Sequence, residues 1–190
     1  SRGLGDVYKR QVIPIAQIGD EMNSGFSFGA GYSLADIHID QIAAESVKNA
    51  VDLCGAKSIP GKNMKIVLEN RAAADLLAVF CPVFFADSAQ KKLSLLAGKE
   101  GSKIASDCVS ITDDSLLDYG FGSRAFDDEG VAGRTTRVIE NGVLKSLLYN
   151  LRTAAKAGTS STGNASKAGY ASPVSTSVTN FYIAPGKRDK

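Results

Sequence analysis

The sequence predicts an α+β fold, in which two long helical regions pack on a mixed or antiparallel sheet that contains a β-hairpin. Two helical patterns follow each other between residues 36 and 98, and strand-like runs with turn residues follow from residue 103. Asn141-Gly142 lies between two apolar runs, and this dipeptide favours the two-residue turn of a hairpin. Because helical and strand patterns are partly segregated, an α+β fold is favoured over a doubly wound sheet.

The composition is that of an ordinary globular protein. The 190 residues are 44% hydrophobic and 22% charged, which allows one domain or two small ones. A formal net charge of +2 without a clustered basic face gives no electrostatic reason to expect a nucleic-acid partner. No apolar run is long enough to span a membrane, and no secretory signal core is present, so we expect a cytoplasmic protein.

The N-terminal third predicts two short strands. Residues 1–11 have no clear period, and we interpret them as a non-native leader outside the fold. Apolar residues alternate in Val12–Ile18 and again in Gly25–Tyr32, which indicates strands.

The middle of the chain predicts the two helical regions and a strand between them. Asp36–Cys54 carries apolar residues at three- and four-residue steps and is followed by Gly55, a natural helix stop. Met64–Glu69 is apolar and β-branched, which predicts a strand that leads into the next helix. Arg71–Gly98 predicts the second helical region, and Pro82 should kink or split it because proline has no amide hydrogen.

The remaining chain predicts the sheet. Lys103–Thr112 alternates and indicates a strand, after which Asp113 and Asp114 mark a loop. Strands are also expected on both sides of the Asn-Gly turn, at Thr135–Glu140 and Val143–Tyr149, and at Phe181–Ile183. Residues 187–190 read as a solvated basic tail, and no domain linker is evident.

Asp127, Asp128 and Glu129 are the most acidic point of the chain. Three carboxylates could bind a hard cation or orient the amino groups of a peptide. Consecutive side chains cannot all point one way, so a metal would need further ligands. The other interpretation is a structural loop that starts a hairpin, with Gly130 making the turn.

A second polar loop contains Ser161, Thr162, Gly163 and Asn164. Its hydroxyls, amide and glycine backbone suit hydrogen bonds to the main chain of a peptide. The same residues are equally typical of a turn in which Asn164 satisfies its own backbone.

Three motifs, F-D-D-E-G, I-E-N-G-V-L and S-T-G-N-A, occur in this order between residues 126 and 165. In this combination they resemble the PmbA/TldD family, the modulators of DNA gyrase, whose members are related to peptidases. The resemblance covers nearly all of residues 12–186 as the central part of a member, with the N- and C-terminal parts of the family missing. It implies a substrate cleft whose candidate residues are Asp127, Asp128, Glu129, Gly130, Thr162, Gly163 and Asn164.

One branch of this family is described as zinc peptidases with an H-E-x-x-x-H helix, in which two imidazoles bind the ion and the glutamate acts as base. The matching helix at 69–77 contains no histidine. The only histidine, His38, lies near the start of another predicted helix, where a capping or surface role is expected. Cys54, Cys81 and Cys108 do not match the family's third ligand, a cysteine near its C-terminus. The resemblance therefore implies no catalytic or metal-binding residue here, with zinc in a TldD-like partner.

The function implied by the resemblance is that of a PmbA (TldE-like) subunit in a cytoplasmic metallopeptidase that acts on unfolded peptides. The partner would be a TldD-like subunit in a heterodimer, or a second copy in a homodimer. Two alternatives stay open: an autonomous metallopeptidase that uses the acidic loop, and a non-enzymatic interaction protein of the gyrase-modulator kind. No nucleic acid or membrane is expected as a partner.

Overall fold

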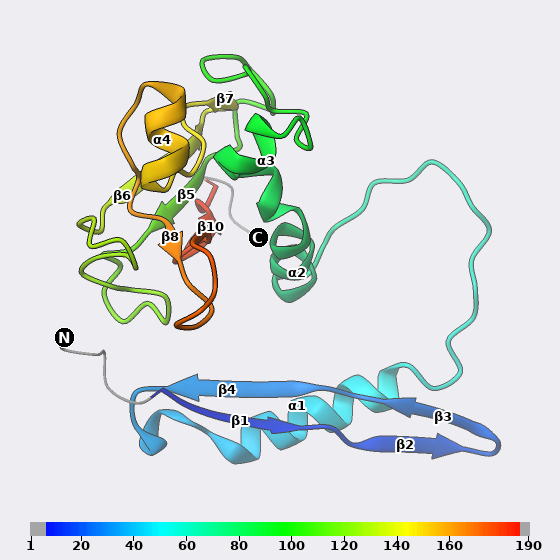
Figure 1. The fold of residues 1–190 in the computed structure, drawn as a ribbon. Coiled ribbons are helices and arrows are strands. Elements are labelled where there is room, and N and C mark those ends of the chain that lie inside the picture. The colour runs from blue at the N-terminus through cyan, green and yellow to red at the C-terminus, as the bar shows by residue number, and fades with distance from the viewer. Residues whose placement is uncertain (1–6, 187–190) are drawn as a thin grey trace. The chain divides into compact units, whose positions relative to one another are not determined.

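The computed structural model describes residues 7–186, and contacts divide the chain into two compact units between Ile66 and Val67 (Figure 1). Residues 1–6 of the predicted leader and the predicted basic tail lie outside the described residues. Each unit has its own strands and helices, although the composition contains no linker signal at this point. Among residues 7–186, no helix combines the length and the apolar character that crossing a membrane requires.

The first unit is a long β-ribbon that packs against one helix (Figure 1). Strands pair antiparallel in two successive segments, β1 (Tyr8–Val12) with β4 (Ser27–Gly31), and β2 (Ile15–Ile18) with β3 (Glu21–Ser24). The predicted strand 12–18 is thus split, and Pro14 lies at the break, where it cannot donate a ladder hydrogen bond. Excluding the leader from the fold was wrong for residues 8–11, because they form most of β1.

A short 3₁₀ turn, η1 (Leu34–Asp36), leads into α1 (Ile39–Asp52), which confirms the first predicted helix. Ile42, Ser46 and Ala50 are buried on one side of α1, at the four-residue spacing of a helix face. Gly25 lies so close to this face that a Cβ there would come within 2.0 Å of the Ser46 carbonyl oxygen. Glycine at this position is therefore required for the ribbon and the helix to approach.

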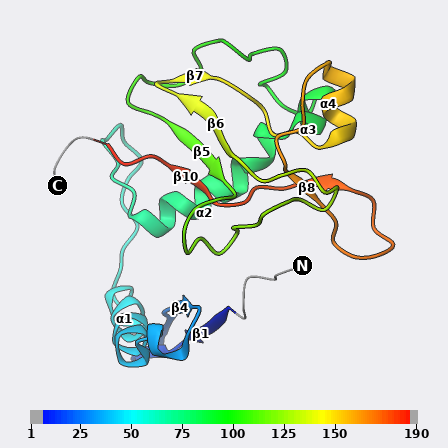
Figure 2. The same cartoon turned by 90° about the vertical axis from the view of Figure 1, so that its left-hand side faces the viewer.

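The second unit places helices around a four-stranded antiparallel sheet (Figure 2). Its helices are α2 (Asn70–Phe80), the 3₁₀ segment η2 (Cys81–Phe84), α3 (Ala86–Gln90) and α4 (Leu151–Ala157). The sheet has the order β10-β5-β6-β7, formed by Phe181–Ile183, Ile111–Asp114, Thr135–Glu140 and Val143–Leu144. A small ribbon of β8 (Ala165–Ser166) and β9 (Ser175–Thr176) completes it. The α+β fold with a β-hairpin is thereby confirmed.

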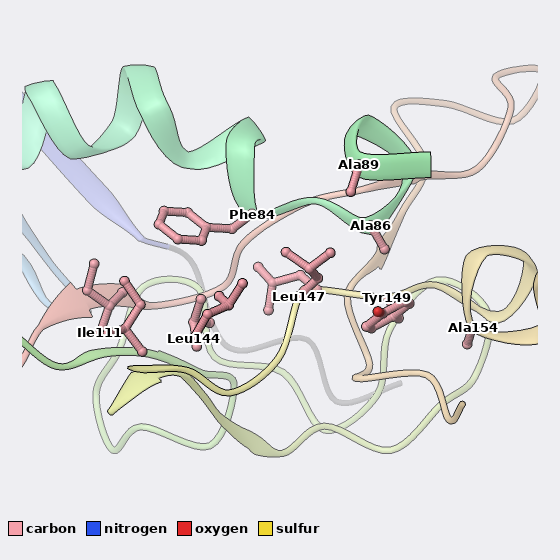
Figure 3. Packing of buried hydrophobic residues seen from close by; sticks show 11 residues of the cluster. Phe84, Ala86, Ala89, Ile111, Leu144, Leu147, Tyr149 and Ala154 are labelled. Carbon is pink, nitrogen blue, oxygen red and sulfur yellow. The ribbon is translucent and has the colours of Figure 1, made fainter. Parts of the chain in front are cut away.

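One apolar cluster holds this unit together (Figure 3). Side chains from the helical side meet side chains from β5, from β7 and from the chain that follows β7: Phe84, Ala86, Ala89, Ile111, Leu144, Leu147, Leu148 and Tyr149. The backbone joins the two groups as well, since Ala86 N donates to Leu148 O and Leu148 N donates to Phe84 O, both at 2.9 Å. Helix α3 also lies beside α4, where Gln90 Nε2 donates to Thr153 O at 2.7 Å.

The Asn-Gly turn is confirmed. Glu140 pairs with Val143, so Asn141 and Gly142 alone form the loop, with φ values of 48° and 80°. Positive φ at both central residues is the geometry of the type I′ turn that the dipeptide favours.

Four predicted elements differ from the structure. Met64–Glu69 contains no strand, and the backbone hydrogen bond that Glu69 O accepts from Ala73 N at 2.9 Å belongs to the start of α2. The second helical region ends at Gln90 instead of Gly98, since Lys92 adopts φ 59° and leaves the helical region of conformational space. The predicted strand 103–112 forms only from Ile111, and it continues through Asp113 and Asp114, which therefore do not lie in a loop. The strand predicted at 143–149 is observed only as β7, and an isolated β-bridge between Leu148 and Phe85 follows it.

Candidate functional site

Asp127 is the buried centre of the acidic loop. Its side chain is 2% exposed and accepts three backbone hydrogen bonds. Oδ1 accepts from Glu129 N and Val131 N, and Oδ2 accepts from Ala165 N, all at 2.9 Å. The first two bonds close the loop over Gly130, which has φ 79° as the turn requires. The third bond ties this loop to the polar loop that is 38 residues later in the chain.

Asp128 and Glu129 engage two other segments. Asp128 Oδ2 accepts from Lys167 N at 2.6 Å, next to β8. Glu129 Oε2 accepts from Leu151 N at 2.7 Å, at the first turn of α4. The three consecutive carboxylates therefore diverge, each toward a different part of the backbone. This arrangement organises three segments around one loop and does not gather the carboxylates around one point.

The polar loop is held against the chain that precedes α4. Tyr149 N donates to Thr162 Oγ1 at 2.7 Å, and Thr162 N donates to Tyr149 O at 3.2 Å. Thr162 Oγ1 also lies 2.6 Å from Asn164 Oδ1. Gly163 has φ 77°, and a Cβ there would come within 2.9 Å of the Ala132 carbonyl oxygen. The acidic and polar loops thus pack directly on each other.

Asn164 links the polar loop to a buried carboxylate in the sheet. Its Nδ2 donates to Asp113 Oδ2 at 2.6 Å and to Ser177 O at 3.0 Å. Asp113 is 2% exposed and also accepts from Thr179 N at 2.7 Å and Thr179 Oγ1 at 3.0 Å. Burial raises the pKa of Asp113, while the hydrogen bonds from Asn164 and Thr179 and the positive charge of Arg124 oppose this increase.

Arg124 and Asp113 belong to this arrangement although no sequence motif indicates them. Arg124 Nη2 donates to Gly163 O at 3.2 Å, and its buried Nε has no hydrogen-bond partner among residues 7–186. Arg124 and Gly163 are 39 residues apart in the sequence, so no local pattern indicates their contact. The contact becomes visible only in the fold. The structure thus brings all seven sequence-predicted site residues into one region and adds these two.

An open depression of about 360 Å³ borders this region. It is lined by residues that follow the acidic loop, by one side of α4 and by the start of the polar loop: Val131, Arg134, Leu151, Ala154, Ala155, Thr159, Ser160 and Ser161. Apolar side chains and methyl groups line most of it, while one guanidinium and three hydroxyls supply polar groups. A small ligand group with both apolar and polar parts would suit this lining.

In the described part of the chain, the side chains that zinc prefers do not gather in one place. His38 is an exposed residue at the start of α1 and makes no capping hydrogen bond, so its predicted surface role holds and its capping role does not. Cys81 is buried at η2, where burial and nearby Asp113 raise the pKa of its thiol and so oppose the thiolate form. Within residues 7–186, no group of three or more histidine, cysteine, aspartate or glutamate side chains is placed to share a metal.

The motifs and the fold agree with a comparison to known families. Residues 60–190 match the PmbA/TldA metallopeptidase C-terminal domain, and the chain belongs to the PmbA/TldD family. It is 35% identical over 176 residues to a metalloprotease of Methanothermobacter thermautotrophicus, an alignment that covers 86% of this chain and 37% of that protein.

Solved structures agree in fold. A candidate modulator of a DNA gyrase from Thermotoga maritima superposes with a TM-score of 0.83 at 32% identity, over 95% of this chain and 40% of that one. TldE from Thermococcus kodakarensis has the same fold with a TM-score of 0.78 at 24% identity, over 96% of this chain and 41% of that one. The chain therefore spans about two fifths of the length of these proteins.

Proposed function

We propose that this chain acts as a PmbA/TldE-like subunit of a TldD/TldE-type metallopeptidase, which hydrolyses unfolded peptides in the cytoplasm. One observation carries the proposal: the sequence of α2, N-R-A-A-A-D-L-L-A-V-F, contains no histidine. The resemblance implies that this helix matches the one that bears H-E-x-x-x-H in the zinc-binding branch. A TldD-like partner would supply the zinc, and this subunit would shape the cleft in which the peptide lies.

The paired loops support a role in forming a cleft wall. Asp127, Asp128 and Glu129 each anchor a different backbone segment, so the loop carries a defined surface without needing a bound ion. Thr162, Gly163 and Asn164 are fixed against it by the hydrogen bonds described above. A rigid wall of this kind positions a peptide at low entropic cost.

The sheet offers an edge to which an extended peptide can add. At one end, β7 is covered, because Leu144 N donates to Ser102 O at 3.0 Å and Gly101 N donates to Leu144 O at 2.7 Å. At the other end, no strand within residues 7–186 pairs with the outer edge of β10. Main-chain hydrogen bonds at such an edge recognise extended peptides with little dependence on sequence.

The test combines metal analysis with hydrolysis of an unfolded peptide. The protein is purified without chelator and assayed alone, with a TldD-like partner, and with a partner whose H-E-x-x-x-H glutamate is replaced by glutamine. We expect no stoichiometric zinc in this chain, and hydrolysis only in the mixture with the unmodified partner. One zinc per chain together with hydrolysis by the chain alone would instead establish an autonomous metallopeptidase, with Asp127, Asp128 and Glu129 as the first ligands to replace.

A further inference from the structure

We propose that the depression beside α4 binds the C-terminal residue of a peptide, with the terminal carboxylate on Arg134 and the side chain against α4. This inference rests on the proposed function, because it specifies which part of a peptide substrate the cleft region recognises. It assigns a role to Arg134, Thr159 and Ser160, which none of the sequence motifs includes.

The apolar part of the depression is built on α4. Leu151, Ala154 and Ala155 lie on one side of the helix, at the three- and four-residue spacing of neighbouring positions, and Val131 faces them from the acidic loop. Ala155 is exposed, and its small side chain leaves space that a larger one would fill. A volume of about 360 Å³ is at the small end for ligand pockets, which suits one terminal residue.

Arg134 supplies the positive charge at the rim. Its main-chain oxygen accepts from Ser115 N at 3.3 Å and from Ser115 Oγ at 3.1 Å, so the backbone at this position is fixed. Its side chain is exposed, and the guanidinium forms no ion pair or side-chain hydrogen bond with the residues that the structure describes. A guanidinium presents its N–H groups as a fork that matches the two oxygens of a carboxylate.

The surroundings favour an anion at this place. Helix α4, with the sequence L-R-T-A-A-K-A, carries Arg152 and Lys156 and no acid. Two acidic side chains lie near these residues, and each accepts a hydrogen bond. Glu129 Oε2 accepts from Leu151 N at 2.7 Å, and Asp114 Oδ1 accepts from the hydroxyl of its strand partner Thr135 at 2.8 Å. Thr159 and Ser160 add exposed hydroxyls that can donate to a second carboxylate oxygen.

The combination of groups distinguishes a chain terminus from an internal acidic residue. An aspartate or glutamate side chain has its carboxylate at the tip and brings little apolar surface. A C-terminal leucine, valine or phenylalanine presents a carboxylate and an apolar side chain from the same Cα. Only the terminal residue therefore uses the guanidinium and the apolar wall together.

The experiment compares two fluorescent unfolded peptides that end in leucine, one with a free carboxylate and one with a terminal amide. Binding to the full chain is measured by fluorescence anisotropy at low salt. We expect the free carboxylate to bind about tenfold more tightly than the amide, as a charge-assisted hydrogen-bond pair provides. Arg134→Ala should remove this preference. Ala155→Leu should weaken binding of the peptide with the free carboxylate, because the larger side chain fills the depression.

Arg152→Ala is the matched control, because it removes the same charge from α4 at a position that does not line the depression. It should leave the preference intact, and thermal unfolding of every variant tests whether the fold is preserved. If both peptides bind equally well, or if the two arginine variants lose the preference equally, the inference is wrong while the proposed function stands. If neither peptide binds the chain or its mixture with a TldD-like partner, the proposed function falls and the inference falls with it.

Discussion

Asp127 is acidic in a loop that sequence motifs associate with a cleft, yet its own oxygens are fully directed at the backbone. A carboxylate that accepts three N–H groups is a strong structural group, because each bond is charge-assisted and the site is 2% exposed. Its contribution is therefore to the geometry of the loops, on which any cleft beside them depends.

We predict that Asp127→Asn lowers the free energy of unfolding by about 1–3 kcal/mol, since one oxygen becomes an NH₂ group that faces a backbone N–H donor. Urea denaturation measures this loss. Asp118→Asn is the control, because Asp118 is exposed and should change stability by less than about 0.5 kcal/mol. Equal effects of the two substitutions would contradict the structural role of Asp127.

Asp113 gives a pH-dependent prediction. Burial raises the pKa of this carboxyl, so the folded chain holds its proton more tightly than the unfolded chain does. The resulting stability is fully present below the unfolded pKa and is lost as the pH rises through the folded pKa. Asp113→Asn abolishes this titration and places its amide against Asn164 Nδ2. Its destabilisation should therefore be larger at about pH 4 than at about pH 7, and a pH-independent difference would refute the assignment.

At the scale of elements, the hairpin turn requires glycine at position 142 for two reasons, a positive φ and a lack of space for a side chain. Gly142 has φ 80°, and a Cβ there would come within 2.4 Å of the Ala105 carbonyl oxygen. Gly130 has nearly the same φ, 79°, with open space around it. The two positions therefore separate backbone strain from steric clash.

Gly142→Ala should accordingly destabilise the fold more than Gly130→Ala, and Gly142→Val should cost roughly 1–3 kcal/mol or more. Thermal unfolding of the three variants gives the comparison. Matching losses for the two alanine variants would mean that segment 105–106 does not pack against the turn as described.

The sequence predicted correctly those elements that interactions between neighbouring residues determine. The apolar spacing of α1 and the Asn-Gly dipeptide both act within a few residues, and both predictions are confirmed. The helical prediction is wrong after Gln90 because tertiary contacts override the local pattern: Ser94 Oγ donates to Val83 O at 2.6 Å, in a segment that turns at Lys92 and Gly98.

Long-range pairing explains the other differences. The alternation in 103–112 looks like a strand, but Ile104 N and Ala105 N both donate to Gly142 O, so that stretch wraps around the turn of the hairpin. The site residues follow the same rule. The motifs indicated both loops, but neither Arg124 nor Asp113 stands out until the fold brings it to the polar loop.

At the scale of the whole molecule, the division into two units makes the connecting segment a distinct feature. Residues 55–69 have no helix or strand and are exposed throughout. Proteases cut first in exposed segments of this kind, because such a backbone can enter the active site of the digesting protease while the folded core stays intact.

We predict that limited trypsin digestion cuts first after Lys57, Lys62 or Lys65 and leaves a resistant C-terminal fragment, since that unit has its own apolar core. Mass spectrometry at short times identifies the sites, and circular dichroism tests whether the fragment stays folded. First cuts after Lys91, Lys92, Lys99 or Lys103 would show that the second unit opens more readily than the connection.

The Asn141-Gly142 turn also bears on how the protein ages. Asn-Gly is prone to deamidation, because the unhindered glycine nitrogen can attack the asparagine side chain, and asparagine is among the thermolabile residues. In this fold the Gly142 N–H donates to Val109 O at 2.8 Å, and Asn141 N donates to Ser110 Oγ at 3.0 Å. The attacking nitrogen must give up its hydrogen bond and the turn must open before the ring can close. The hairpin that the dipeptide creates therefore protects it, and the chemical lifetime of this asparagine should report how often the hairpin opens.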